Sequence, residues 1–439
     1  MKTTLLVLTL AACPLAFGQI TDYLGPGVTT GGAGNIGRRS GQDVDLRYFV
    51  NATGVYDTGL VPFNVDSKGA LLKPKSVFGV ELGIGAYGRH TWRRSVLGLD
   101  YGGNYRHYPA AQSYNGANQQ LALGYTFQKS QRLVFDFQES AGTYNYGAVT
   151  ANGGGVADGS IIDPTSLLFD NRTMYVQSNL DVRIAKSSRT VITIGGSGYI
   201  VRRQAKALVG VNGYNLHGNV QHRVSASTVL GVAFQHIHYD YPKAFGESDI
   251  NMYTGNVSRV FSRVWTLNLS AGFYRSEVQG IQDVAVDPAL TALLGISRVR
   301  STYFRVNFIP TGSATVSRSF RKSSLNFSYT RSVSPGNGVY LTSRQEAQYA
   351  SWAYTGLRKV SFSLTGSRSV LDALGQDLSR YTQIAASATL SYALTNSLHL
   401  SGTLAHRKQD IENNTFRPDS NRVSFSIVFS PGDVPISFH

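Results

Sequence analysis

The stretch VSFSIVF at residues 423–429 decides the fold, because apolar and polar residues alternate along it. In an extended strand, successive side chains point to opposite faces. The valine, isoleucine and phenylalanine side chains at the odd positions therefore form one apolar face, and the two serines lie on the other face. Such a strand suits a wall that meets an apolar medium on one side and a polar medium on the other.

The same alternation recurs along the chain at intervals of about 20 residues, each comprising a strand and its connection. About 18 strands are predicted. Their expected ranges are 44–56, 77–88, 95–108, 118–128, 132–146, 172–185, 190–202, 207–222, 227–241, 250–261, 264–278, 301–317, 323–333, 345–356, 359–370, 380–394, 397–409 and 421–429.

The connections between these strands fall into two sets. Those after even-numbered strands are tight, as at 129–131, 186–189 and 395–396. Most of those after odd-numbered strands are longer: 57–76, 147–171, 242–249, 279–300, 334–344, 371–379 and 410–420. Short turns on one rim and long loops on the other are typical of membrane barrels. The pattern predicts an all-β fold, a transmembrane antiparallel up-and-down β-barrel. A soluble sheet is the alternative, but it needs a second layer over its apolar face, and no helical pattern supplies one.

Composition agrees with one large all-β architecture. The chain has 439 residues, of which 42% are hydrophobic and only 15% charged, with 46 glycines and 25 tyrosines. After the N-terminus, no apolar run is long enough for a transmembrane helix. Barrel strands need only one apolar face, so average hydropathy hides them. We expect the barrel to occupy residues 43–430, followed by a short C-terminal tail at 431–439.

The N-terminus reads as an export signal. Lys2 is followed by an apolar run at 5–10 and a small-residue cleavage site at 16–18, so we expect a signal peptide over 1–18. A lipoprotein signal ending at Cys13 is the alternative. Residues 19–42 are rich in glycine and lack alternation, which predicts a flexible leader. Cys13 is the only cysteine, so the expected mature chain would have no disulfide and no cysteine-ligated metal.

Charge is sorted between the two sets of connections, within a formal net charge of +15. Acidic residues gather in the long loops and basic residues at the tight turns, where Arg318, Arg321 and Lys322 form the clearest basic rim. A basic rim suits anionic phospholipid headgroups, and acidic loops could hold divalent cations beside lipopolysaccharide. The basic residues form no single tract, so we expect no nucleic-acid partner.

Tyrosines cluster near the strand ends beside the long loops, and two explanations stay open. A ring with an apolar body and a polar hydroxyl suits the membrane interface, while ordinary strand propensity also favours tyrosine. The tyrosines concerned are Tyr105, Tyr108, Tyr144, Tyr146, Tyr239, Tyr241 and Tyr340.

Strand parity predicts which charged residues point into the barrel. Positive and negative charges are mixed, so they roughly cancel. The candidate lumen-lining residues are Arg47, Glu81, Asp100, Asp136, Asp181, Arg183, Arg305 and Arg407.

One strand also carries His236, His238 and Asp240 at alternate positions, a stack that could bind a metal or could be a simple polar patch. The second interpretation is preferred, so no metal or cofactor is predicted.

Together, the signal peptide, paired strands, rim asymmetry and final aromatic strand resemble Gram-negative outer-membrane β-barrels of porin size, over residues 44–429. The resemblance implies export to the outer membrane and recognition by the barrel assembly machinery of a terminal aromatic, either Phe429 or Phe438. It also implies a porin-like passive channel that transports hydrophilic solutes such as saccharides. One alternative is a structural barrel with a plugged lumen that binds or exports surface polysaccharide. An outer-membrane hydrolase is less favoured because no local motif places a nucleophile beside a base, so we expect no enzyme.

Overall fold

The computed structural model describes most of the chain between residues 46 and 431. The described ranges are 46–61, 64–65, 71–72, 75–144, 172–285 without 205, 207, 243 and 263, 298–412 without 337, 358, 376 and 377, and 419–431. The expected signal peptide and leader lie outside these ranges, as does the expected tail beyond residue 431. The described residues contain no helix that is long and apolar enough to span a membrane.

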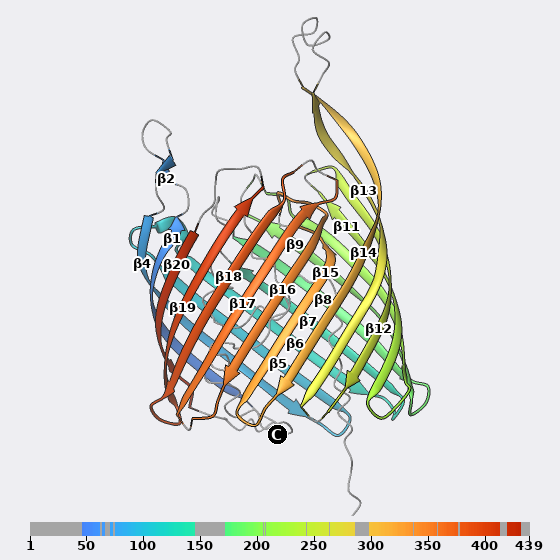
Figure 1. The fold of residues 1–439 in the computed structure, drawn as a ribbon, viewed down its shortest axis with the longest axis horizontal. Coiled ribbons are helices and arrows are strands. Elements are labelled where there is room, and N and C mark those ends of the chain that lie inside the picture. Colours follow the sequence, from blue (N-terminus) through green and yellow to red (C-terminus); the bar gives the residue numbers. More distant parts are fainter. Residues whose placement is uncertain are drawn as a thin grey trace, which may run out of the picture.

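Eighteen strands form a single antiparallel sheet, which closes because β1 pairs with both β20 and β4 (Figure 1). The all-β barrel of about 18 strands predicted from the sequence is thus confirmed. The strands of the wall are β1 (Arg47–Val61), β4 (Lys75–Thr91), β5 (Ser95–His107), β6 (Gly116–Gln128), β7 (Leu133–Tyr144), β8 (Thr173–Ala185), β9 (Thr190–Arg203), β10 (Val211–Arg223), β11 (Thr228–Tyr241), β12 (Gly246–Val260), β13 (Trp265–Ala285), β14 (Arg298–Ser319), β15 (Ser323–Ser334), β16 (Ser343–Tyr354), β17 (Val360–Ala373), β18 (Tyr381–Ala393), β19 (Leu398–Ile411) and β20 (Asp419–Phe429).

Two connections contain small elements of their own. Between β1 and β4, β2 (Asn64–Val65) and β3 (Leu71–Leu72) pair as a separate two-stranded sheet. Between β5 and β6 lies the 3-10 turn η1 (Gln112–Tyr114). Both lie at the end of the barrel that carries the longer connections, while the tight turns lie together at the other end (Figure 1). We call these the loop end and the turn end.

The apolar faces point away from the barrel axis. In β20, Val423, Phe425, Ile427 and Phe429 are 45–55% exposed, whereas the serines between them are buried. The same alternation holds in β4, where Leu82 is 53% exposed. No second layer of the described chain covers this outer surface, and an apolar band around a closed wall requires lipid. The apolar faces read from the sequence are therefore the outer face of a membrane-spanning wall.

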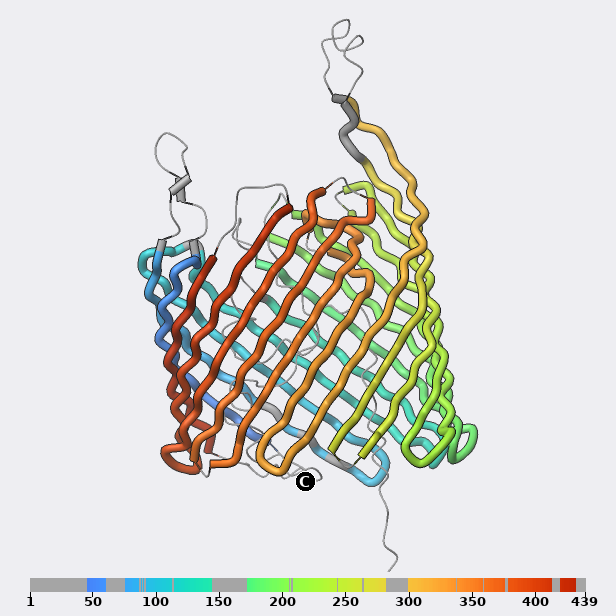
Figure 2. Tube along the Cα trace, in the orientation of Figure 1, coloured from blue at the N-terminus to red at the C-terminus, as the bar shows by residue number. Residues whose placement is uncertain are grey.

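The hairpin of β13 and β14 is longer than the sequence indicates. Both ends of the expected loop at 279–300 are strand, because β13 continues to Ala285 and β14 begins at Arg298. These two strands pair from Trp265 to Ala285, whereas the recorded pairing of β14 with β15 starts only at Gly312. The hairpin projects past the loop-end rim (Figures 1 and 2). The two strands satisfy each other's backbone groups there, and the residues added to the predicted strands, 279–285 and 298–300, show no regular alternation of apolar and polar residues.

The tyrosines near the loop end divide between the two faces of the wall. Tyr105 is 51% exposed on the outer face, as an interfacial ring would be. Tyr108, Tyr239, Tyr241 and Tyr340 are instead buried, which excludes them from an outer aromatic belt. Tyr239 and Tyr241 share the parity of the inward Gln235, and Tyr108 and Tyr340 lie in connections. The side chain of Tyr144 and all of Tyr146 lie outside the described residues.

Candidate functional site: the barrel interior

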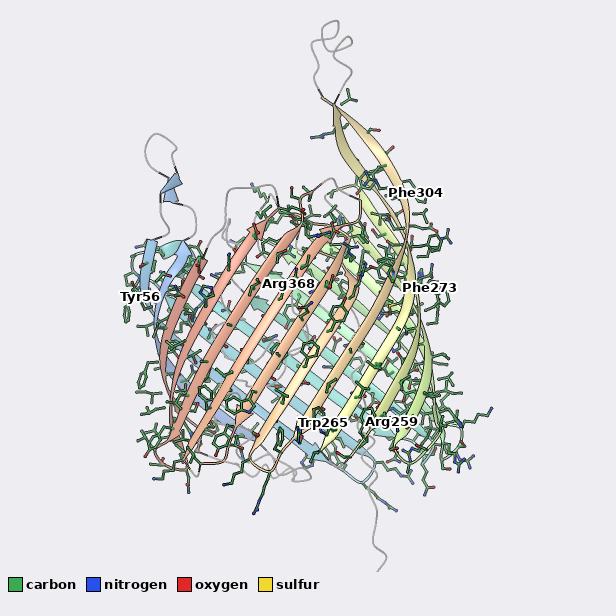
Figure 3. The ribbon with its side chains drawn as sticks, in the orientation of Figure 1. Tyr56, Arg259, Trp265, Phe273, Phe304 and Arg368 are labelled. Atoms are coloured by element: carbon green, nitrogen blue, oxygen red, sulfur yellow. The ribbon has the colours of Figure 1, made fainter. Side chains whose placement is uncertain are left out.

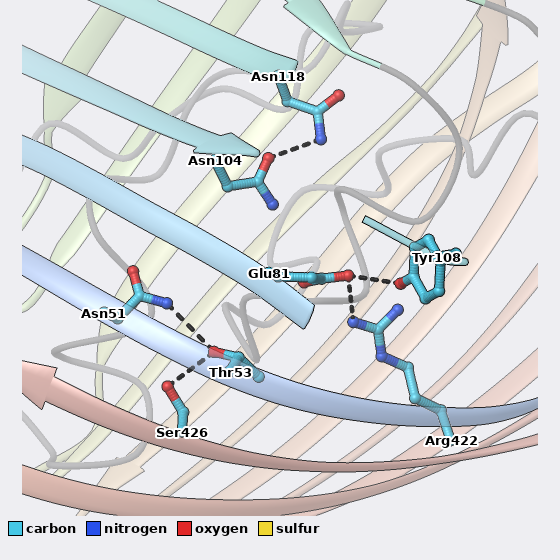
Figure 4. A network of polar contacts seen from close by, with 8 residues as sticks. All are labelled: Asn51, Thr53, Glu81, Asn104, Tyr108, Asn118, Arg422 and Ser426. Carbon is cyan, nitrogen blue, oxygen red and sulfur yellow. Dashed lines mark hydrogen bonds and ion pairs between the residues drawn. The ribbon is translucent and has the colours of Figure 1, made fainter. Parts of the chain in front are cut away.

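The inner face of the wall is polar. Short amide and hydroxyl side chains alternate with the outward apolar residues on most strands, and many are nearly inaccessible to solvent. The buried set includes Asn51, Thr53, Asn118, Ser140, Asn215, Asn219, Gln235, Gln383, Ser391, Gln409, Ser424 and Ser426. Strand parity fixes these positions. The alternation that makes the outer face apolar therefore also makes the inner face polar. Neighbouring groups bond to each other, as Asn51, Thr53 and Ser426 do across the closure of the barrel (Figure 4).

A buried ion pair lies where the barrel closes. Arg422 of β20 donates to Glu81 of β4 across β1, at 2.9 Å between Nη2 and Oε1, and both side chains are less than 10% exposed. The hydroxyl of Tyr108 donates to the same carboxylate oxygen at 2.7 Å (Figure 4). Burial raises the pKa of Tyr108, so this phenol stays protonated and remains a donor. The sequence identified Glu81 as inward, but it missed Arg422, although that residue has the parity of the buried Ser424.

Two further polar pairs, each with one carboxylate, cross the inner wall. Asp136 accepts a hydrogen bond from Thr126 at 2.7 Å and an ion-paired hydrogen bond from Arg183 at 3.2 Å, which links β6, β7 and β8. Asp181 lies 2.9 Å from Nε2 of His217 on β10, with Gly195 of β9 between them in the sheet. An opposite charge or a hydrogen bond from a neighbouring strand therefore meets each of these carboxylates. The pairing weakens any single-sign field inside the wall.

The other candidate lumen-lining residues have less uniform surroundings. Arg407 is 9% exposed and shares the parity of the buried Gln409. Arg47 and Asp100 are half-buried, on the parity of the buried Phe49 and Arg106. Arg305 is exposed and lies on β14 beyond its recorded pairing with β15, with its guanidinium 5.7 Å from the ring of Tyr303. Arg305 thus lies on the projecting hairpin.

At the loop end, the interior becomes apolar. Buried tyrosine and aliphatic side chains from β8 to β15 pack together there, with Leu341 of the β15–β16 connection among them. The cluster comprises Tyr175, Tyr199, Val201, Val211, Ile237, Tyr239, Tyr241, Ile250, Tyr274, Ile309, Val333 and Leu341. An apolar cluster on the inner face of a membrane barrel is covered by protein rather than lipid, so it fills part of the lumen near the mouth.

The β15–β16 connection, residues 335–342, is the loop that lies on this cluster. The hydroxyl of Tyr241 donates to the carbonyl of Pro335 at 3.2 Å and lies 3.0 Å from Oγ1 of Thr342, which also hydrogen-bonds Ser248. The amide of Val209, in the β9–β10 connection, donates to the carbonyl of Gly338 at 3.1 Å. Because β10 and β15 are separated by four strands in the sheet, this contact joins two distant parts of the rim. The loop therefore narrows the outer mouth of the barrel.

Backbone geometry helps the loop to fold inward. Gly336 and Gly338 have φ values of +72° and +94°, a region that residues with a Cβ rarely adopt. Tyr340 anchors the far end by donating to the carbonyl of Ser379 at 2.5 Å, and burial raises its pKa.

Beneath the apolar cluster lies a cavity of about 160 Å³ against the inner wall of β10–β15. Its lining mixes amides and hydroxyls with apolar side chains, with Tyr274, Ile237 and Ile250 at the loop end and Arg331 at one side. No carboxylate is found among the described residues that line it. Its lining includes Gln235, Asn256, Asn268, Thr254, Ser270, Ser313 and Thr315. Such a lining offers donors and acceptors to an uncharged hydroxylated solute.

The three residues of the basic rim expected at one tight turn do not share one environment in the structure. Arg321 and Lys322 are exposed in the β14–β15 turn. Arg318 is half-buried instead, with its guanidinium 4.7 Å from the ring of Trp265 and 4.1 Å from that of Phe320, on the outer face beside the exposed Leu325. Arg259 stacks over Phe261 in the same way at the neighbouring turn. Figure 3 shows Arg259 and Trp265 together at the turn end. These cation–π contacts hold the two arginines on the outer face, away from the lumen.

The stack of His236, His238 and Asp240 faces outward, on the parity of the exposed Phe234. Each member meets a neighbour of its own: His236 contacts Asn251 at 3.0 Å, His238 contacts Asp249 at 2.9 Å, and Asp240 accepts from Asn212 at 3.1 Å. Within the described ranges, no three His, Cys, Asp or Glu side chains are placed to hold a metal ion. The structure gives no support to a metal site at this stack.

The sequence matches no family model and no curated protein. Among solved structures, the chain is similar to OccK2 (OpdF) of Pseudomonas aeruginosa in complex with glucuronate, at 13% identity and a TM-score of 0.42, covering 89% of this chain and 100% of that one. A BenF-like porin from Pseudomonas fluorescens gives 10% identity and a TM-score of 0.42, with 88% and 99% covered. The ferric-catecholate import receptor Fiu of E. coli is 9% identical with a TM-score of 0.41, and the match covers 88% of this chain and 82% of that one. These values mark a distant likeness of architecture, and glucuronate is a ligand of the first protein alone.

Proposed function

We propose that the protein is a passive channel for small hydrophilic solutes in the outer membrane of a Gram-negative cell. The observation that carries the proposal is a closed 18-stranded wall with an apolar outer face and a polar inner face. Barrels of 16–18 strands generally enclose an aqueous lumen. A wall held only for structure has no need of an inner face covered with amides, hydroxyls and compensated charges.

The chemistry of the interior favours uncharged, hydroxylated solutes such as saccharides. The cavity of about 160 Å³ presents amides and hydroxyls, and the apolar faces of Tyr274 and Ile250 lie at its loop end. Sugars combine hydroxyls with apolar ring faces, so this mixture fits them better than it fits a strongly charged ion. The pairing of Asp136 with Arg183, and of Glu81 with Arg422, supports the same preference.

The proposal includes export of the chain to the outer membrane and the lipids that surround the barrel there. Residues 1–18 would direct export as a cleaved signal, and the barrel assembly machinery would read Phe429 or Phe438. Phe429 ends the last strand and is 45% exposed on the outer face of the folded barrel. Phospholipid at the turn end and lipopolysaccharide at the loop end are the proposed lipid partners.

Single-channel recording tests the channel directly. Refolded protein in a planar bilayer should give stepwise conductance, and liposomes that contain it should swell in isotonic solutions of mono- and disaccharides. Swelling rates should fall as solute size rises. Reproducible lack of conductance from protein shown to be folded by its resistance to protease would refute the channel.

A plugged barrel at the cell surface, which binds polysaccharide or supports its export, is the second candidate. The observation that favours it is the loop at 335–342, which is held over the interior by Tyr241, Thr342 and the amide of Val209. If the loop closes the mouth, folded protein will give no conductance, whereas protein from which residues 336–340 have been deleted will conduct. We propose no catalytic role.

A further inference from the structure

A groove of about 710 Å³ runs across the outer face of the wall from β15 to β20. Its floor is formed by Ala350, Gly366 and Ala386, which are direct neighbours in the registers of β16, β17 and β18. A Cβ added to Gly366 would have no heavy atom within 4 Å, so this position opens to the surroundings. Small residues therefore leave a trough in the lipid-facing surface.

Larger apolar side chains border the groove on the side toward the turn end. Trp352, Leu364 and Leu404 are 37%, 41% and 60% exposed, and Trp352 and Leu364 pair directly in the sheet. Val423 continues the same row on β20 beside Leu404. Across the five strands from β16 to β20, spaced about 4.8 Å apart, the floor of the trough is about 20 Å long, which is comparable to an extended acyl chain.

The other border carries two cations, and on β20 it ends at Asp419, which pairs with Lys408 in the register and lies 3.4 Å from His406. In the row immediately toward the loop end, Arg368 of β17 pairs with Ile384 of β18, and Ile384 pairs with Lys408 of β19. Arg368 and Lys408 are exposed, and Figure 3 shows Arg368 on the outer wall, well away from the turn end. By contrast, Arg344 lies 2.5 Å and Arg380 3.7 Å from the carboxylate of Asp372. Within the described part of the chain, Arg368 has no carboxylate within ion-pairing distance.

We propose that this groove binds one phosphorylated glycolipid of the outer leaflet, the lipid A part of lipopolysaccharide. An acyl chain would lie over Gly366, against Trp352 and Leu364, and a phosphate would lie on the guanidinium of Arg368. Arginine matches phosphate geometrically and forms charge-assisted hydrogen bonds with it. The assignment rests on the proposed location in the outer membrane, with the loop end outward.

The position of Arg368 on the loop-end border favours lipid A over other occupants of the groove. A phospholipid of the inner leaflet would place its phosphate at the turn end, beyond the apolar row of Trp352 and Leu364, whereas Arg368 lies on the opposite border of the groove, toward the loop end. A second copy of the chain would bring its own apolar wall against the groove and leave Arg368 without an anion, which is costly in a lipid-facing contact. A lipid with its phosphate above an acyl chain satisfies both borders of the groove.

Native mass spectrometry of the delipidated barrel in detergent tests this proposal, with bis-phosphorylated lipid A as the titrant. Arg368→Gln should weaken lipid A binding about tenfold, the change expected for the loss of one charge-assisted hydrogen bond. Gly366→Leu should weaken it as well, because the new side chain fills the trough without meeting protein atoms.

Matched controls use the same substitutions elsewhere on the outer face. Arg202→Gln removes an exposed arginine from β9, and Gly402→Leu adds a side chain on β19, where a Cβ also has nothing within 4 Å but does not line the groove. Both should bind lipid A as the native protein does.

The outcomes separate this proposal from the channel. Equal loss in the control variants, or phosphatidylglycerol binding as tight as that of lipid A, would overturn it in favour of unspecific annular lipid. Dimers that persist without lipid and that Gly366→Leu disrupts would assign the groove to a second copy instead. Conductance should be the same for native protein, Arg368→Gln and Gly366→Leu, so lost binding with intact conductance supports the site. A barrel that binds lipid A in this way but never conducts would refute the channel alone.

Discussion

Leu269 and Ser270 are neighbours in β13 but face different surroundings. Leu269 is 42% exposed on the outer face, and the half-buried Ser270, at the next position, points to the inner face. Adjacent residues of a strand therefore face lipid and the polar interior in turn. The loss of stability caused by a substitution depends on which face the residue occupies more than on the residue replaced.

This difference gives the first prediction. Leu269→Arg should destabilise the barrel by about 2–4 kcal/mol, the cost of an arginine on the lipid face near the midplane. Ser270→Arg should cost much less, because its side chain reaches the polar interior. Urea unfolding in lipid vesicles measures the free energy of unfolding of both variants. Equal destabilisation by the two changes would contradict the facing described for β13.

Arg422 carries the second prediction. Replacing it by glutamine leaves Glu81 buried without its cation, and breaking a buried pair costs about 3–5 kcal/mol. The double variant with Glu81→Gln should lose less than the sum of the two single changes, because neither charge is then left alone. Lys186→Gln, in an exposed turn, is the control and should change stability by less than about 0.5 kcal/mol. Additive losses would show that the pair does not couple the closing strands.

Among the connections, the loop at 335–342 has the clearest functional consequence. It lies on apolar side chains inside the barrel, and it is fastened by Tyr241, Thr342 and Val209. Few connections of the described chain bond to a strand or loop so far around the rim. A short element held by a few contacts is also the kind that opens locally, so the mouth is adjustable while the wall is not.

The third prediction concerns these contacts. Tyr241→Phe combined with Thr342→Val removes the hydroxyls that hold the loop and should weaken its docking by about 1–3 kcal/mol. Single-channel conductance should rise and become noisier, because the loop leaves the mouth for part of the time. Tyr253→Phe, on the exposed outer face, is the matched control. Unchanged conductance in the double variant would mean that the loop does not limit the path.

Across the whole molecule, the distribution of charged side chains changes along the barrel axis. The inner wall pairs its carboxylates with Arg183, His217 and Arg422, whereas the exposed Arg321 and Lys322 lie at the turn end. Compensated charges in the wall confer little ion selectivity. Exposed charges at a mouth attract counter-ions over a Debye length of about 10 Å at 0.1 M salt.

The fourth prediction follows from this arrangement. The channel should show a weak anion preference at low salt that fades as salt rises. Arg321→Gln combined with Lys322→Gln should reduce it, while Arg318→Gln should not, because that guanidinium stacks on outward-facing rings. The reversal potential in a salt gradient across a planar bilayer measures the preference. Strong cation selectivity would contradict this distribution of charge.

The sequence by itself determined the wall. Alternation in stretches such as 423–429 fixed the strands, their facing and the barrel of about 18 strands, because strand parity is local and each strand needs one apolar face for lipid. Tertiary structure alone decided which inward groups meet. Arg422 and Glu81 are 341 residues apart, and only closure of the barrel brings them together. The inward loop, the length of the β13–β14 hairpin and the groove at Gly366 likewise depend on contacts between strands and rims, which no local pattern records.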